Sequence, residues 1–143
     1  LINKLKDKNI DKIYYNKFTK GLNVIDEDGN EVSYLDVTKQ GDKSKSYAYC
    51  SDTSFCESII DTIKGVDLLY CETTFLQRHQ DKAISTFHST TKDAGILAQK
   101  AQVKKLLIGH FSSRYDDIQE FFNETKEFFN NVILSEEGKK IVI

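Results

Sequence analysis

Three side chains that could bind a metal ion or exchange protons each follow a short apolar stretch of the sequence. They are Asp52 after residues 46–50, Glu72 after residues 66–71, and His110 after residues 104–108. Ligands of α/β sheets collect beyond the carboxyl ends of parallel strands, because several loops converge at that edge. Carboxylates and imidazoles serve there as metal ligands or as general acids and bases. If the three stretches are strands of one sheet, the pattern predicts a metal or acid–base site.

Each of the three residues also has a purely structural interpretation. Asp52, within Ser51-Asp52-Thr53, could accept hydrogen bonds from the first turn of a following helix. Glu72 could be an ordinary surface carboxylate, and His110 could be a histidine whose ring is hydrogen-bonded at the sheet edge. The residues alone leave both interpretations open.

The other two histidines of the chain occupy different contexts. His88 lies in Phe87-His88-Ser89-Thr90, immediately before a predicted helix, and could belong to the helix cap. His79 lies between Arg78 and Gln80 in a polar stretch, and nothing around it distinguishes it from a surface residue.

The elements that would position these side chains alternate along the second part of the chain. Apolar residues spaced as on one helical face indicate helices over residues 57–64, 90–100 and 116–130. Thr90 and Asp93 can form a capping pair at the start of the second helix. Strands are expected at residues 46–50, 66–71, 104–108, 132–134 and 139–143, which makes an α/β layered arrangement.

The first part of the chain predicts a β-hairpin. The segments Leu22–Ile25 and Glu31–Val37 flank residues 26–30, whose Asp28-Gly29 step is typical of a hairpin turn. Residues 1–20 have mixed character and carry no assignment. A polar loop, residues 38–45, then leads into the strand at residues 46–50.

The composition is that of an ordinary globular protein. The chain has 143 residues, of which 39% are hydrophobic and 29% charged, enough for one domain with a core. No apolar run approaches the length of a membrane span, so no membrane association is expected. Three cysteines, Cys50, Cys56 and Cys71, match no disulfide or zinc-finger spacing, which favours a reducing cytoplasm.

The charge is unevenly distributed along the chain. The first twenty residues contain six lysines and two aspartates, a balance of +4, which leaves −6 for the remainder of a chain of net charge −2. A phosphate contact and a solvated lysine-rich surface both account for this asymmetry. The sequence starts at Leu1 and contains no methionine, so we expect it to be a piece of a longer protein.

Taken in order, four motifs resemble the C-terminal portion of ribonuclease Z, a branch of the metallo-β-lactamase superfamily. They are Tyr47-Ala48-Tyr49-Cys50-Ser51-Asp52-Thr53, Cys71-Glu72-Thr73-Thr74-Phe75, His88-Ser89-Thr90 and Gly109-His110-Phe111-Ser112-Ser113-Arg114-Tyr115. Near the start, Lys6-Asp7-Lys8-Asn9 resembles the family's Pro-x-Lys-x-Arg-Asn motif, which holds the 3′ region of tRNA. The chain departs from the family pattern at Cys71 and Thr73, which replace a histidine and an alanine. It also departs at Lys4 and Lys8, which stand where the family has the proline and the arginine.

The resemblance implies the C-terminal half of a four-layer αββα sandwich and a zinc-dependent endoribonuclease that removes the 3′ trailer from tRNA precursors. It implies that Asp52 bridges two zinc ions, that His110 ligates one of them, and that a metal-activated water attacks the phosphodiester. Glu72 would orient His88, and His88 would protonate the leaving oxygen. The RNA phosphates would be held by Arg114, Lys6, Lys8 and Asn9.

The resemblance also implies an organisation and partners for the chain. We expect one domain piece over residues 1–143, with a substrate-contacting segment (1–20), the hairpin (22–37) and an α/β catalytic half (46–143). The family's His-x-His-x-Asp-His signature is expected upstream in an N-terminal half, so this fragment alone should be inactive. A tRNA precursor and a second copy of the protein, as a homodimer, are the expected partners.

Two other functions are alternatives at this point. The protein could be another phosphodiesterase or hydrolase of the metallo-β-lactamase fold that acts on small esters. It could also be an inert folded fragment that binds neither metal nor RNA tightly.

Overall fold

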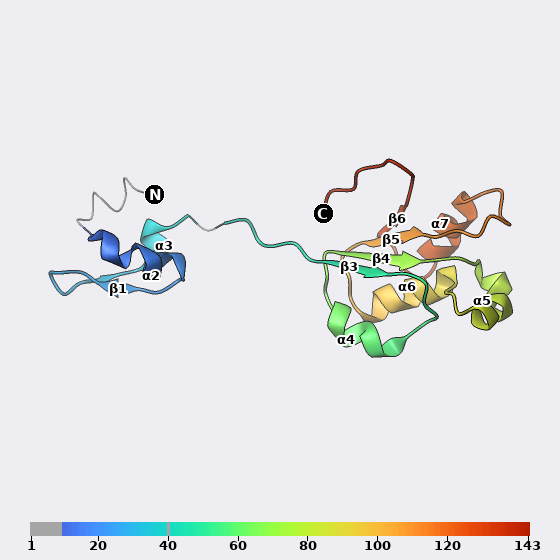
Figure 1. The fold of residues 1–143 in the computed structure, drawn as a ribbon, viewed down its shortest axis with the longest axis horizontal. Coiled ribbons are helices and arrows are strands. Elements are labelled where there is room, and N and C mark those ends of the chain that lie inside the picture. The colour runs from blue at the N-terminus through green and yellow to red at the C-terminus, as the bar shows by residue number, and fades with distance from the viewer. Residues whose placement is uncertain (1–9, 40) are drawn as a thin grey trace. The chain divides into compact units, whose positions relative to one another are not determined.

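The structure of the protein is a computed structural model that describes residues 10–39 and 41–143. Its contacts divide the chain into two compact units, residues 1–44 and 45–143, whereas the sequence predicts one domain piece. Each unit has its own cluster of buried apolar side chains. The ribbon of the chain is drawn in Figure 1. None of the helices in the described ranges is long and apolar enough to cross a membrane.

The first unit combines short helical turns with a hairpin. Its elements are η1 (Lys12–Tyr14), α2 (Tyr15–Thr19), β1 (Val24–Ile25), β2 (Glu31–Val32) and α3 (Tyr34–Val37). The two strands are antiparallel and pair Val24 with Val32, as the Asp-Gly step predicts. The predicted strand over 31–37 is wrong beyond Val32, because the Ser33 side chain accepts a hydrogen bond from the Leu35 N–H and starts α3. Phe18 and Val37 are buried with the two paired valines and form the core of this unit.

The second unit is built on a four-stranded sheet in which all neighbouring strands are parallel. The strands are β3 (Tyr47–Cys50), β4 (Leu68–Glu72), β5 (Leu106–Gly109) and β6 (Val132–Leu134), in that order across the sheet. Cys50 pairs with Cys71, and Glu72 pairs with Gly109, so β3, β4 and β5 end at one edge. The parallel sheet with intervening helices confirms the predicted α/β class.

Helices lie between the strands along the chain: η2 (Glu57–Ile59), α4 (Ile60–Ile63), η3 (Gln77–His79), α5 (Gln80–Thr86), α6 (Thr91–Lys100) and α7 (Gln119–Lys126). Of these, α4, α6 and α7 pack against one face of the sheet. Figure 1 shows α4 and α6 along this face. Leu69, Leu106 and Ile108 of the sheet are buried in one cluster with Leu97 of α6 and Phe121 of α7. This burial of apolar side chains on both partners holds the helices against the sheet.

Helix α6 begins where the sequence predicts. The Thr90 hydroxyl accepts from the Asp93 N–H at 3.2 Å, and the Asp93 carboxylate accepts from the Thr90 N–H at 2.9 Å, which is a complete capping box. Gly95 permits the close approach of the segment that follows α7, because a Cβ at this position would lie 2.6 Å from the Cβ of Phe128. The predicted helix over 116–130 is shorter in the structure and spans only α7.

Two parts of the second unit differ from the sequence analysis. Helix α5 was not predicted, because Ala83 is its one buried residue and leaves no periodic apolar pattern. The predicted strand over 139–143 is wrong: the Lys139 N–H donates to the Glu136 carbonyl in a turn, and no strand pairing is present among these described residues. Ile141 and Ile143 instead line a groove on the sheet face opposite α6, together with Tyr47, Leu68 and Leu107.

Candidate metal and acid–base site

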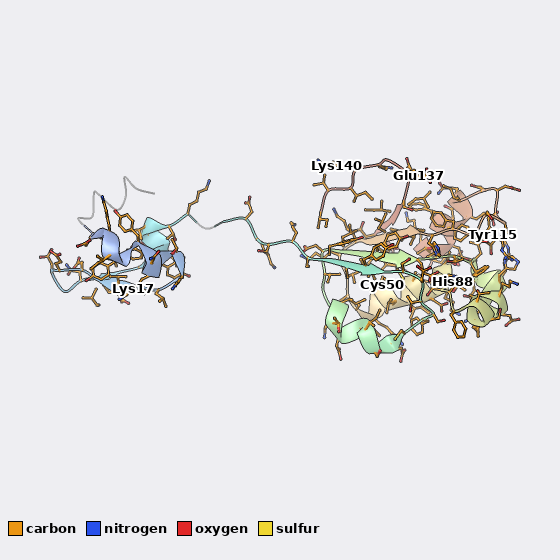
Figure 2. The ribbon with its side chains drawn as sticks, viewed as in Figure 1. Lys17, Cys50, His88, Tyr115, Glu137 and Lys140 are labelled. Carbon is orange, nitrogen blue, oxygen red and sulfur yellow. The ribbon has the colours of Figure 1, made fainter. Side chains whose placement is uncertain are left out.

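The carboxyl edge of the sheet gathers the four polar residues that the sequence singles out. Glu72 is the last residue of β4, while Asp52 and His110 lie just beyond β3 and β5. One ligand atom each from Asp52, His88 and His110 lies within 4.8 Å of the other two. Figure 2 shows His88 beyond the end of β3, where Cys50 is the last strand residue. The sequence-based expectation of one shared edge therefore holds for the placement of these side chains.

The backbone at this edge turns sharply. Asp52 and His110 have φ angles of 50° and 62°, in the left-handed region that non-glycine residues rarely adopt. Such conformations persist where the surrounding structure holds them, and they are concentrated at functional sites. Here both residues in this conformation carry a potential metal ligand.

Glu72 is a fully buried carboxylate with a complete set of donors. It accepts hydrogen bonds from the Thr53 N–H at 2.6 Å and from the Thr74 hydroxyl at 2.5 Å. Burial by itself raises the pKa of Glu72, but these two bonds and that of His88 outweigh it and leave the pKa below its ordinary value. The side chain is therefore a buried anion that stays ionised at neutral pH.

His88 is oriented by this anion. Its Nδ1 lies 3.1 Å from Oε1 and 3.0 Å from Oε2 of Glu72, so Nδ1 carries the hydrogen and donates it. The next residue fixes the loop, because the Ser89 hydroxyl donates to the Thr53 carbonyl at 2.6 Å. The Nε2 atom of His88 remains available to a ligand or a substrate, since Nδ1 is already used.

His110 is oriented by a neutral neighbour. Its Nδ1 lies 2.9 Å from the Thr74 hydroxyl oxygen, which already donates its own hydrogen to Glu72, so His110 Nδ1–H is the donor. This tautomer leaves a lone pair on Nε2, which lies 3.6 Å from the Asp52 Oδ1 atom. Two electron-pair donors that face each other at this distance suit a shared cation.

The donor set at this edge fits a divalent metal ion. Two imidazoles and one carboxylate are ligands typical of zinc. Both imidazole rings are held by a hydrogen bond at Nδ1, which leaves Nε2 for a ligand. Cys71, which stands where the resembled family has a histidine, is buried and points into the apolar core. Burial raises the pKa of its thiol, so Cys71 acts as a packing residue.

Arg114 lies on the loop after His110 and is exposed. Its Nε donates to the Ser112 hydroxyl at 3.0 Å, and its guanidinium carbon lies 5.0 Å from the centre of the Phe75 ring. Stacking of this kind holds an arginine while its remaining N–H groups face solvent. The other residues expected to contact RNA, Lys6, Lys8 and Asn9, lie outside the described residues.

Two features of this edge were missed by sequence reasoning. Thr74 connects Glu72 to His110, and its only sequence signal was its place two residues after the glutamate. His79, interpreted as a surface residue, has its Nδ1 2.6 Å from the Tyr115 hydroxyl, which accepts from the Leu76 N–H at 3.2 Å. Tyr115 is labelled in Figure 2. These contacts join segments far apart in sequence, so no local pattern predicts them.

Comparison with known proteins identifies relatives for most of the chain. No protein-family model matches it. A ribonuclease Z of Porphyromonas gingivalis is 41% identical over 133 residues, which are 93% of this chain and 44% of that relative. A ribonuclease Z of Cytophaga hutchinsonii is 44% identical over 125 residues, 87% of this chain and 40% of that relative. The solved structure of the metallo-β-lactamase fold protein YhfI from Bacillus subtilis matches with a TM-score of 0.62 and 26% identity, over 69% of this chain and 40% of YhfI.

The parallel sheet, its helices and the likeness to YhfI define a part of a metallo-β-lactamase fold, as the sequence predicts. The chain spans less than half the length of the curated relatives that it matches. Over this part it is homologous to ribonuclease Z, and the predicted resemblance is confirmed.

Proposed function

We propose that these residues form part of a zinc-dependent endoribonuclease that removes the 3′ trailer from tRNA precursors. Homology to proteins named ribonuclease Z supports the substrate class. The observation that carries the proposal is the arrangement at the sheet edge. Ligand atoms of Asp52, His88 and His110 lie close enough together to hold a metal ion, beside the buried Glu72 carboxylate that orients the His88 imidazole.

Asp52 and His110 are the residues proposed to hold the metal. The Asp52 carboxylate has two oxygens and could bind one or two zinc ions. His110 offers the lone pair of its Nε2 atom. When bound, the metal would supply Lewis-acid chemistry that activates water and stabilises charge on a phosphate. Thr74 keeps His110 in the tautomer that can bind, because it accepts the Nδ1 hydrogen.

His88 is proposed to handle the proton of the leaving group. Its Nδ1 hydrogen is fixed by Glu72, so a second proton on Nε2 makes an imidazolium directed away from the buried carboxylate. Ionised Glu72 stabilises that imidazolium through a charge-assisted hydrogen bond. The ring is partly exposed, with 24% of its side-chain surface accessible, so Nε2 can reach the oxygen of a bound RNA strand.

The RNA backbone is proposed to be held by Arg114, with Lys6, Lys8 and Asn9 as further contacts. Arg114 fits this role because its guanidinium is stacked on Phe75 and presents N–H groups close to the site. Phosphate contacts position a strand without reading its sequence, which suits a processing enzyme that acts on many precursors. The homodimer expected from the resemblance remains a prediction.

The remaining metal ligands are proposed to lie outside these 143 residues. The chain has three histidines, and His79 is hydrogen-bonded to Tyr115 away from the metal-binding group. A catalytic zinc ion takes about three protein ligands, so two ions need more than Asp52 and His110 supply. We therefore expect the 143-residue chain alone to bind zinc weakly and to cleave no tRNA precursor.

The test is a chimera in which this chain replaces the matching segment of the Porphyromonas gingivalis relative. We expect the chimera to cleave the 3′ trailer from a tRNA precursor in the presence of zinc, and the chain alone to be inactive. Hydrolysis of a small chromogenic phosphodiester tests the alternative function, a hydrolase that acts on small esters. A chimera that hydrolyses this ester and leaves the precursor intact would favour a small-ester hydrolase and contradict the proposal.

A further inference from the structure

Phe87 is an exposed aromatic residue directly before His88. Its side chain is 76% exposed, the highest value among the large apolar residues in the described part of the chain. Its φ angle is 60°, in the left-handed region that a bulky side chain rarely adopts. The fold thus holds a large ring in water, on a strained backbone, one residue from the proposed proton donor.

The backbone at Phe87 explains why this position determines the placement of His88. The Phe87 N–H donates to the Ile84 carbonyl at 3.3 Å, and the His88 N–H donates to the Ala83 carbonyl at 2.9 Å. This pair of bonds is the Schellman motif that ends α5, and its left-handed residue is usually glycine. The motif needs the conformation but not the ring, because a glycine would adopt it without steric cost.

The ring contributes little to the folded core. An apolar side chain that remains in water gains almost none of the free energy that burial supplies. A phenylalanine here therefore costs stability through its backbone and returns little through packing. This combination points to a role in binding and not in folding.

We propose that Phe87 is a stacking platform for a nucleobase next to the cleaved phosphodiester. This inference rests on the proposed function, because an RNA strand at His88 Nε2 brings its bases within reach of the neighbouring residue. Aromatic side chains bind unpaired bases through their faces, and such stacking tolerates any base. Phe87 would thus hold the strand through a base while Arg114 holds its phosphates.

Ile84, three residues before Phe87, is a second exposed apolar side chain of this segment, with 63% of its surface accessible. A second copy of the chain could also cover these side chains. We favour the nucleobase because Phe87 adjoins the site, where the proposed reaction requires single-stranded RNA. Stacking on a nucleobase requires RNA, whereas covering by a second copy of the chain does not. The experiment below separates the two occupants by this difference.

The chain has no tryptophan, so Phe87→Trp introduces a single fluorescent reporter. We expect its emission to be quenched by a single-stranded RNA oligonucleotide and not by an abasic oligonucleotide of equal length. Val142→Trp, at a position 72% exposed in the C-terminal segment, is the control and should show no quenching. Phe87→Gly should bind the oligonucleotide about tenfold more weakly, with a melting temperature that is unchanged or higher.

Three results would overturn the proposal that Phe87 stacks on a nucleobase. They are equal quenching by the abasic strand, unchanged RNA affinity of Phe87→Gly, and a change in oligomeric state as the sole effect of that substitution. The measurement needs no cleavage, so its outcome is separate from that of the chimera assay. A chimera that fails to cleave while Phe87→Trp reports base stacking would refute the proposed reaction and leave the RNA contact standing.

Discussion

The imidazole of His88 and the carboxylate of Glu72 face each other, with Nδ1 3.1 and 3.0 Å from the two carboxylate oxygens. Glu72 ends a strand in the middle of the sheet and is fully buried, whereas His88 lies on a loop and is partly exposed. A buried anion thus fixes one nitrogen of a ring whose other nitrogen faces outward. Proton transfer at this edge of the sheet would therefore run through Nε2 of His88.

Glu72→Gln in the chimera should slow precursor cleavage by about a hundredfold or more, the usual scale of lost acid–base catalysis. The amide carries no charge to stabilise the His88 imidazolium, and its NH₂ group would replace one acceptor oxygen and face either the Thr53 N–H or the Thr74 hydroxyl, which are both donors. We expect a loss of stability as well, about 1–3 kcal/mol for an unsatisfied buried donor. Glu57→Gln, on an exposed carboxylate, is the control. A Glu72→Gln chimera that cleaves at the unaltered rate would show that this carboxylate has no catalytic influence.

Thr74→Val should weaken zinc binding by roughly 10- to 100-fold, the scale found for residues that orient metal ligands. The valine has the same shape but cannot accept the hydrogen of His110 Nδ1, so the ring loses its fixed tautomer. Thr74→Ser keeps the hydroxyl and should restore the affinity. Competition with a fluorescent zinc chelator measures all three proteins. Equal affinities for the threonine and valine forms would contradict a role for this hydroxyl.

Asp67, at the opposite edge of the sheet, should control stability in a pH-dependent way. Its carboxylate accepts from Lys104 Nζ at 2.6 Å and from the Ser46 N–H at 2.9 Å, and it joins the starts of three strands. The hydrogen bond from Lys104, followed by those from Ser46, holds the pKa of Asp67 well below its ordinary value. The folded-state pKa is lowered, so the stability that Asp67 provides is present above the unfolded pKa of about 4.

That stability disappears as the pH falls below about 4 toward the folded-state pKa. Asp67→Asn should therefore lower the melting temperature of the 143-residue chain at pH 7, and the difference should shrink in acid. Asp61→Asn, on an exposed side chain of α4, is the control and should change little. A difference between the Asp67 forms that is constant from pH 7 to pH 3 would contradict the charge-based explanation.

The sequence predicts the strongly patterned part of this fold and the polar residues at its edge. The strands were recognised as short apolar runs, and the Thr90–Asp93 capping box marked the start of α6. Asp52 and His110 were found because each follows such a run. Position after a strand is a local property, so one sequence is enough to see it.

The contacts that complete the site could not be predicted in the same way. Thr74 reaches His110 across 36 residues, and His79 reaches Tyr115 across the same separation. Neither contact leaves a periodic signal, because each depends on how two loops meet in space. The left-handed backbone of Phe87 is also invisible in the sequence, since glycine is the residue that usually marks it.

The zinc content of the chimera, compared among Asp52→Ala, His110→Ala and His88→Ala, tests the central claim most directly. The claim is that Asp52 and His110 bind metal whereas His88 transfers a proton, although all three side chains offer ligand atoms within 4.8 Å of each other. Mass spectrometry of the metal, with precursor cleavage measured on the same samples, gives the answer. We predict that the first two substitutions remove zinc and activity together. His88→Ala should keep its zinc while cleavage falls by about a hundredfold or more. Equal loss of zinc in all three proteins would make His88 a ligand and contradict the assignment.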